Sequence, residues 1–254
     1  MSQLSKFLPT SVTRWLKILL RPKSVAVLPG AITYADDGFA TIHSASFGLE
    51  PRFADAYQGG LRTGSWSNVE WRAHVIAWAA QYAVSLEGDF VECGVNRGGY
   101  SKMIVDYLDF SKLDKKFYLL DTFAGLVPEY VSAEEKQRGI LDAYRYDDCF
   151  RAVSKTFSSV PNVVLIKGPV PDTLSQVAAQ AIAFLSIDMN CIEPEIAAAN
   201  ALWDRIVPGG IVVLDDYGHP LHVGQKHAFD EFAREKNVTI LSLPTAQAII
   251  VKPH

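Results

Sequence analysis

The feature that most constrains the fold is a series of five short apolar segments that alternate with helical patterns. Each segment has the length of a β-strand. Its apolar residues follow one another without the alternation of a half-exposed strand. Strands separated by helices form parallel sheets with helices on both faces. We therefore predict an α/β fold whose parallel strands are residues 89–94, 116–121, 162–168, 182–188 and 209–216.

Two further strands are predicted near the C-terminus, in the segments VTILSLP and QAIIVKP, with no helix between them. The helices between the earlier strands are predicted from apolar residues at helical spacing. An S-x-x-E capping box places one helix start at Ser67 to Glu70, and a second box, Ser132 to Glu135, starts a long polar helix. Other helices are predicted within residues 98–108, 172–180, 194–206 and 224–236.

The N-terminal segment has a different character. Residues 1–60 show no clear period, and we predict an irregular extension there, followed by one domain over residues 61–254. Residues 1–35 carry five basic residues and no acidic one. We expect a flexible or packing arm. The alternative is a basic amphipathic helix in residues 1–23 that makes a weak contact with a membrane or a partner. Its apolar run is too short to span a bilayer.

Composition limits the partners and the compartment. The net charge of the 254 residues is −4, so no basic character points to nucleic acid. The three cysteines are widely spaced and form neither a zinc pattern nor a disulfide framework. This favours a reducing, cytoplasmic setting. The sequence leaves a homodimer open.

A glycine-rich loop, ECGVNRGGYS, follows the first predicted strand of the sheet. Gly94 permits a tight turn, and Gly98 and Gly99 let the backbone approach a ligand. The loop lacks the G-x-G-x-x-G pattern of dinucleotide sites, and Glu92 beside it would repel a pyrophosphate. Glu92 can instead face an ammonium group. Asp121, at the next strand end, can accept hydrogen bonds from a ribose.

An amino acid joined to a nucleoside would satisfy both of these acidic positions, and S-adenosylmethionine is such a molecule. The alternative is that the glycines serve only as turn residues. In open parallel sheets, ligands bind beyond the carboxyl ends of the strands. The strand-end segments therefore supply the predicted cofactor contacts, which are Glu92, Cys93, Gly94, Gly98, Ser101, Asp121, Thr122, Phe123 and Gly168.

Three more acids follow the last two parallel strands. Asp188 ends one strand, and Asp215 and Asp216 end the next. Neighbouring strands lie about 5 Å apart, so the three carboxylates are expected at one rim. Three oxygen donors suit Mg²⁺. A metal there could bind two neighbouring hydroxyls of a substrate and lower the pKa of one, while an aspartate receives the proton. Alternatively, these acids hold helix N-termini or backbone amides.

His219 lies in the loop after the acidic pair. We consider it as a general base or a substrate contact, and as an ordinary loop histidine without a catalytic part.

The segments GDFVECGVNRGG, LLDTFAGL, IKGPVPDTL, SIDMN and PGGIVVLDDYG resemble the macrocin O-methyltransferase family in order and spacing, from about residue 60 onward. The resemblance implies a Rossmann-like class I methyltransferase fold. Its mostly parallel seven-stranded sheet has helices on both faces and a C-terminal antiparallel strand. It also implies that Glu92 and Gly94 border the methionine part of the cofactor, that Asp121 takes the ribose, and that Thr122 and Phe123 lie near the nucleoside. Mg²⁺ would be bound by Asp188, Asp215 and Asp216, with Asp188 also the base.

One segment departs from the family. After the fourth strand the family usually has D-G-D-L-Y-E-S-T, where this chain has D-M-N-C-I-E-P-E from Asp188 to Glu195. That segment borders the acceptor, so the resemblance does not identify the acceptor. We predict an S-adenosylmethionine-dependent, Mg²⁺-assisted O-methyltransferase. Its acceptor would be a sugar-containing or other polyhydroxylated small molecule with neighbouring hydroxyls. The alternatives are an NAD-type oxidoreductase and a non-catalytic methyltransferase-like scaffold.

Overall fold

The computed structural model describes residues 30–254, which divide into two compact units. In the described part, the smaller unit comprises residues 30–35 and 39–45, and the larger one comprises residues 36–38 and 46–254. Strands β1 (Tyr34–Asp36) and β2 (Phe39–Thr41) form a two-stranded sheet. The predicted basic arm, residues 1–23, lies outside the described residues. All other elements within residues 30–254 belong to the larger unit.

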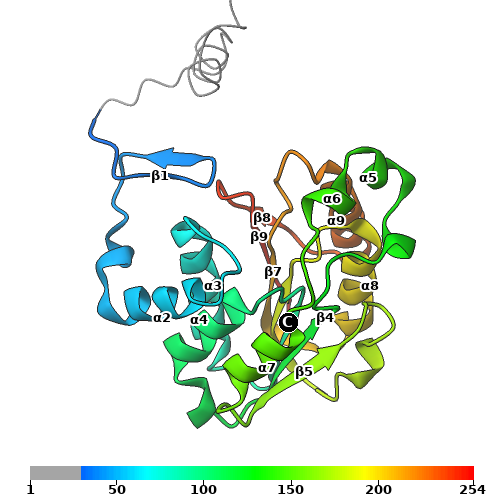
Figure 1. Ribbon diagram of the computed structural model, residues 1–254, viewed down its shortest axis with the longest axis horizontal. Coiled ribbons are helices and arrows are strands. Elements are labelled where there is room, and N and C mark those ends of the chain that lie inside the picture. Colours follow the sequence, from blue (N-terminus) through cyan, green and yellow to red (C-terminus); the bar gives the residue numbers. More distant parts are fainter. Residues whose placement is uncertain (1–29) are drawn as a thin grey trace, which may run out of the picture. The chain divides into compact units, whose positions relative to one another are not determined.

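A seven-stranded sheet forms the centre of the larger unit, in the order β5-β4-β3-β6-β7-β9-β8 (Figure 1). Strands β3 to β7 are parallel, and the antiparallel strand β9 pairs with β7 and with β8. This confirms the predicted fold class. The strands are β3 (Asp89–Cys93), β4 (Phe117–Asp121), β5 (Val163–Lys167), β6 (Ile182–Ile187), β7 (Ile206–Leu214), β8 (Leu241–Ser242) and β9 (Ala248–Val251).

Helices cover both faces of this sheet (Figure 1). Along β4, Phe117 and Leu119 pack into one core and Tyr118 and Leu120 into the other, which is why the strand is apolar at successive positions. The first core includes α2 (Pro51–Leu61), α3 (Glu70–Ala83), α4 (Gly99–Leu108) and α7 (Phe150–Phe157), and the second includes α8 (Ile192–Trp203) and α9 (Val223–Lys236).

The remaining helices are short. They are α5 (Ala133–Gln137), α6 (Ile140–Ala143) and the 3₁₀ turns η2 (Ser46–Leu49), η3 (Phe110–Lys112), η4 (Pro128–Tyr130) and η5 (Leu174–Gln176). Within residues 30–254, no helix is both long and apolar enough to cross a membrane. All three cysteines are free and buried. The cytoplasmic location that the cysteines favour stays a prediction.

Only one of the two predicted capping boxes forms. The capping box at Ser132 and Glu135 is present. The box at Ser67 is not, because Asn68 takes a positive φ of 56° and turns the chain after Ser67. Helix α3 begins two residues later, and the Val69 N–H donates to the Tyr57 hydroxyl instead. The prediction of one long polar helix is also wrong. The segment instead forms the separate helices α5, α6 and α7, and Gly139 takes the left-handed conformation between the first two.

The expectation of irregular structure up to residue 60 is wrong for residues 51–60. They form most of α2, whose buried face includes Phe53 and Tyr57. A pair of glycines in this segment weakens the helical pattern of the sequence. In the structure these glycines allow close packing, since a Cβ atom on Gly60 would lie 2.7 Å from the Gly99 carbonyl oxygen of α4.

The strand order reverses between β3 and β6, which opens a crevice at their carboxyl ends. Gly94 lies there with a φ of 93°, and a Cβ atom on it would lie 1.8 Å from the Asp188 carbonyl oxygen. The absence of a side chain at Gly94 therefore lets the ends of β3 and β6 come together.

We expect Gly94→Ala to destabilise the fold far more than Gly139→Ala. Both residues have a positive φ, but nothing lies within 4 Å of a Cβ on Gly139, so that variant adds only the left-handed strain of about 1–2 kcal/mol. The backbone clash at Gly94 should add more than about 2 kcal/mol to this loss. Urea unfolding followed by circular dichroism measures both, and equal losses would contradict the close approach.

Candidate active site

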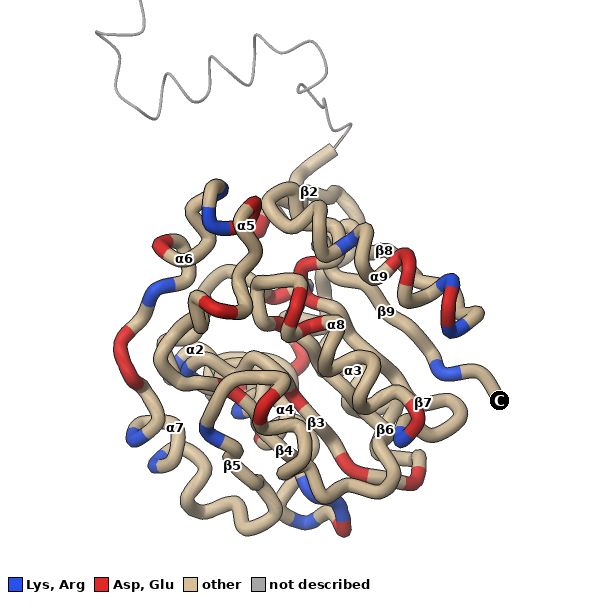
Figure 2. The backbone as a smooth tube through the Cα atoms, turned by 90° about the vertical axis from the view of Figure 1, so that its right-hand side faces the viewer, with Lys and Arg blue, Asp and Glu red and all other residues tan. Residues whose placement is uncertain are grey.

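A cavity of about 530 Å³ lies at the carboxyl ends of the parallel strands, a volume typical of small-molecule sites. Figure 2 shows several acidic segments gathered in the centre of its view, above the labels of β3 and β4. The cavity is lined by nine of the residues that the sequence predicts for the site: Glu92, Gly94, Asp121, Thr122, Gly168, Asp188, Asp215, Asp216 and His219.

Asp121 holds the glycine loop against the end of β4. Its Oδ2 atom accepts hydrogen bonds from the backbone N–H groups of Val95 and Asn96, at 2.6 and 2.7 Å. Its Oδ1 atom accepts one from the Tyr146 hydroxyl at 3.0 Å. These donors fix the position of the carboxylate on the cavity wall.

Glu92 lies almost fully buried beneath the loop, 1% exposed, and accepts a hydrogen bond from the Ser101 hydroxyl. Burial raises the pKa of Glu92 to about 8. The side chain is therefore mostly protonated at neutral pH. A cationic group brought into the cavity would favour its charged form.

Four predicted cofactor residues lie off the cavity wall as the described residues form it. Cys93 points into the core beneath the sheet, and Phe123 is fully buried with its ring against Phe150. Gly98 faces the ring of Phe157. Ser101 is buried and meets Glu92 rather than the cavity. The glycine loop and the end of β4 border the cavity, but these four residues face elsewhere.

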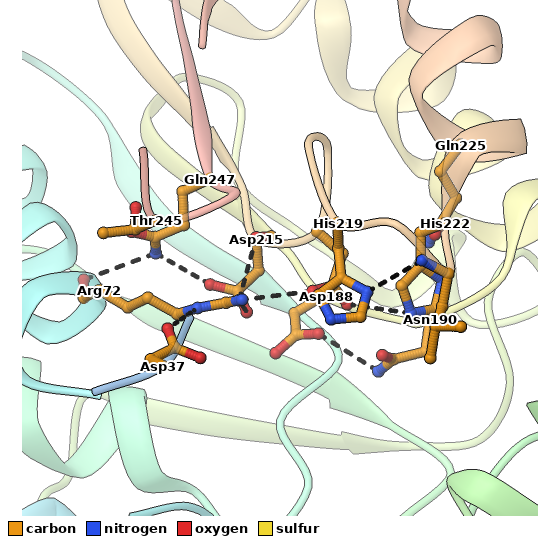
Figure 3. A network of polar contacts seen from close by, with 12 residues as sticks. Asp37, Arg72, Asp188, Asn190, Asp215, His219, His222, Gln225, Thr245 and Gln247 are labelled. Carbon is orange, nitrogen blue, oxygen red and sulfur yellow. Dashed lines mark hydrogen bonds and ion pairs between the residues drawn. The ribbon is translucent and has the colours of Figure 1, made fainter. Parts of the chain in front are cut away.

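The structure brings Asp188, Asp215 and Asp216 together, with one carboxylate oxygen from each within 4.8 Å of the others. A buried arginine lies against them (Figure 3). The Nη1 atom of Arg72 is 2.6 Å from Asp215 Oδ2 and 3.4 Å from Asp216 Oδ1. Its Nε atom is 2.6 Å from Asp37 Oδ2. Gln247 Nε2 donates to the other Asp215 oxygen at 2.9 Å.

Burial raises the pKa of all three aspartates, and most strongly that of Asp188. Arg72 opposes this effect at Asp215 and Asp216. Burial, the largest single influence, would lower the Arg72 pKa, but the surrounding negative charges, led by Asp215 and including Asp216 and Asp37, together raise it overall. Arg72 pairs with Asp215 and Asp216, and Asp188 adds a third carboxylate to the cluster. This all-oxygen set therefore fits a hard divalent cation.

Sequence reasoning missed Arg72. Arg72 shares a helix face with the buried residues Ile76, Ala79 and Ala83, spaced as one stripe. A charged residue within an otherwise apolar stripe indicates a buried charge with a partner. That signal was present in the sequence. Its partners were not identifiable, because Asp215 is 143 residues away.

Glu195, in the segment that departs from the family, was also missed. It is 4% exposed, and its Oε1 atom accepts hydrogen bonds from the N–H groups of Met189 and Asn190, both at 3.0 Å. Burial raises its pKa to about 8. Asn190 has a positive φ of 59°, and its side chain donates to Asp188 Oδ1 at 3.3 Å. The altered segment thus forms a fixed turn beside Asp188.

Other polar groups of the cavity had no signal in the sequence. The Tyr144 hydroxyl lies 2.7 Å from His222 Nε2, and burial lowers the pKa of His222 to about 4. Two atoms of the cavity-lining residues, Trp66 Nε1 and Asn96 Oδ1, are buried with no hydrogen-bond partner among the described residues.

Comparisons with solved structures support the fold. The O-methyltransferase NovP is 21% identical over 72% of this chain and 80% of its own, with a TM-score of 0.62. The calicheamicin methyltransferase CalS11 is 16% identical over 83% of this chain and 94% of its own, with a TM-score of 0.56. The Podospora anserina methyltransferase PaMTH1 in its SAH-bound form is 13% identical over 81% of this chain and 88% of its own, with a TM-score of 0.52.

Comparison with curated proteins gives no significant match. The family model of macrocin O-methyltransferase (TylF) matches residues 74–243, which is more than half of the chain. This match contains the glycine loop, Asp121, the three clustered aspartates and His219. It favours methyl transfer over the hydride transfer of the oxidoreductase alternative. The chain therefore belongs to the macrocin O-methyltransferase (TylF) family and is an S-adenosylmethionine-dependent O-methyltransferase.

Proposed function

We propose that this enzyme methylates a hydroxyl group of a sugar-containing or other polyhydroxylated small molecule, with Mg²⁺ held by Asp188, Asp215 and Asp216. The observation that carries this proposal is that the aspartate cluster and the glycine loop line one cavity. CalS11, which has a similar fold, is a TDP-rhamnose 3′-O-methyltransferase, and this supports a sugar hydroxyl as the acceptor.

The cofactor half of the cavity is formed by the loop after β3 and by the end of β4. Bound S-adenosylmethionine supplies an electrophilic methyl group on a sulfonium. We assign its ammonium to Glu92, whose raised pKa falls when a cation lies beside it. We assign its ribose to Asp121, which the amides of Val95 and Asn96 hold in place. Gly168 and Thr122 complete this side of the wall.

The acceptor half is formed by the ends of β6 and β7. Bound Mg²⁺ would lower the pKa of a coordinated hydroxyl. We assign Asp188 as the group that accepts the hydroxyl proton, at a carboxylate oxygen. His219, on the same wall, is the second candidate for the base. Arg72 holds Asp215 and Asp216 in position from α3.

We expect Asp188→Asn to reduce turnover by at least about 100-fold while the affinity for S-adenosylhomocysteine changes little, because the carboxamide removes a charge and a base but keeps the shape. Turnover is measured with an acceptor found in a panel of nucleotide sugars, and product-cofactor affinity by isothermal titration calorimetry. EDTA should also abolish turnover, and Mg²⁺ should restore it.

The control for this variant is Asp204→Asn, an exposed acid at the end of α8. It should behave like the wild type in both measurements. Full activity of Asp188→Asn, or of the wild type in EDTA, would overturn the metal and base assignments without affecting the family assignment.

We expect Arg72→Met to lower the free energy of unfolding by about 3–5 kcal/mol near pH 8, because it leaves buried carboxylates unpaired. The folded-state pKa values of Asp215 and Asp216 already lie above their usual range, and removing Arg72 raises them further. Such groups lose their contribution to stability as the pH rises through the folded pKa. The loss should therefore be smaller near pH 5.

Urea unfolding at the two pH values measures this effect. The control is Arg138→Met, which replaces an exposed arginine. Its free energy of unfolding should stay within about 0.5 kcal/mol of the wild-type value. A pH-independent loss in Arg72→Met would mean that packing of the arginine stem, rather than its charge, holds α3 to the strand ends.

A further inference from the structure

The loop after β7 carries a residue of a metal-binding type at every third position: Asp216, His219 and His222. Two successive turns account for their arrangement. The His219 N–H donates to the Asp216 carbonyl oxygen at 3.0 Å, and the His222 N–H donates to the His219 carbonyl oxygen at 2.9 Å. Such turns repeat every three residues, so side chains three apart lie on the same side of the loop.

One ligand atom from each of these three side chains lies within 4.8 Å of the others. The two imidazole rings are 5.2 Å apart between centroids. Asp216 Oδ2 lies 3.7 Å from His222 Nε2, whereas Asp216 Oδ1 lies 3.4 Å from Arg72 Nη1. The two oxygens of Asp216 therefore face two different groups of residues, the histidines on one side and the arginine on the other.

We propose that Asp216, His219 and His222 form a second metal site, selective for a borderline divalent transition metal such as Zn²⁺ or Co²⁺. Two imidazoles with one carboxylate suit such ions, whereas Mg²⁺ prefers oxygen donors and waters. Asp216 is shared with the all-oxygen set. Because Asp216 and His219 line the cavity, the remaining coordination positions of the metal are open to a ligand there.

The surroundings of His222 match what a ligating histidine requires. Metal-bound imidazoles donate their other ring N–H to a neighbouring acceptor. Gln225 of α9 lies beside His222 (Figure 3), and its buried Oε1 atom has no hydrogen-bond partner among the described residues. It is therefore available to accept from Nδ1. Nε2 then faces Asp216 and the Tyr144 hydroxyl.

Metal binding would change two contacts in this site. At His222 the metal takes the place of the hydrogen bond with the Tyr144 hydroxyl. At His219, Nδ1 accepts a long hydrogen bond of 3.3 Å from the Leu221 N–H. Ligation through Nε2 places the ring proton on Nδ1 and ends that contact. Neither change involves the two backbone hydrogen bonds that form the turns of the loop.

The test is Co²⁺ binding to the metal-free full-length protein, followed by the visible d–d absorption of the ion. We expect bands that persist in millimolar Mg²⁺. His219→Ala and His222→Ala should each weaken Co²⁺ binding at least about tenfold. Asp188→Asn should keep Co²⁺ binding, because Asp188 belongs only to the oxygen set. His227→Ala, which removes an exposed histidine on α9, is the matched control.

Circular dichroism shows whether His222→Ala is folded. If His222→Ala is not folded, Co²⁺ binding by His219→Ala alone tests the metal site, because His219 lies in the loop at the cavity rim. Wild-type affinity in His219→Ala would overturn the proposal. So would loss of the Co²⁺ spectrum in Asp188→Asn, or no Co²⁺ binding by the wild type. The Co²⁺ absorption does not depend on methyl transfer, so its outcome tests the second metal site independently of the proposed function.

Discussion

The ion pair between Arg72 and Asp215 adds a specific polar link between elements that already share one hydrophobic core. Arg72 comes from α3, Asp215 follows β7, and Gln247 contributes a hydrogen bond from the turn before β9. The Arg72 and Asp215 side chains are 9% and 8% exposed, so both charges are largely removed from water. A buried pair of this kind adds little net stability, but breaking it is strongly unfavourable. It therefore fixes where the helix meets the strand ends.

The segment from Asp188 to Glu195 shows how an altered sequence can keep the local geometry. Asn190 occupies the left-handed region, which asparagine tolerates better than most residues. Glu195 binds two backbone N–H groups of this turn, and Asn190 supports Asp188. The first acid of the family pattern is retained in position. The second is an amide that can donate to the first but cannot receive a proton.

The strands and the strand-end acids could be predicted because their signals are local. A doubly buried strand must be apolar at successive positions, and its end must be polar where it meets a cavity. Other features depend on contacts distant in the sequence. Helix α2 was obscured by the glycines that let it approach α4, and the start of α3 was set by Tyr57 rather than by Ser67. The orientation of Cys93 and Phe123 away from the cavity depends on core packing that a segment alone does not reveal.

The close approach of Gly94 to the Asp188 carbonyl has a practical consequence for redesign. It places the ends of β3 and β6, which we assign to the cofactor and the acceptor, in direct backbone contact, so neither can be shifted without the other. Engineering that aims at a different acceptor is therefore best directed at the walls. Tyr144 and Met189 line the same cavity from separate segments and are the residues to exchange first, whereas Asn190 supports Asp188 and should be kept.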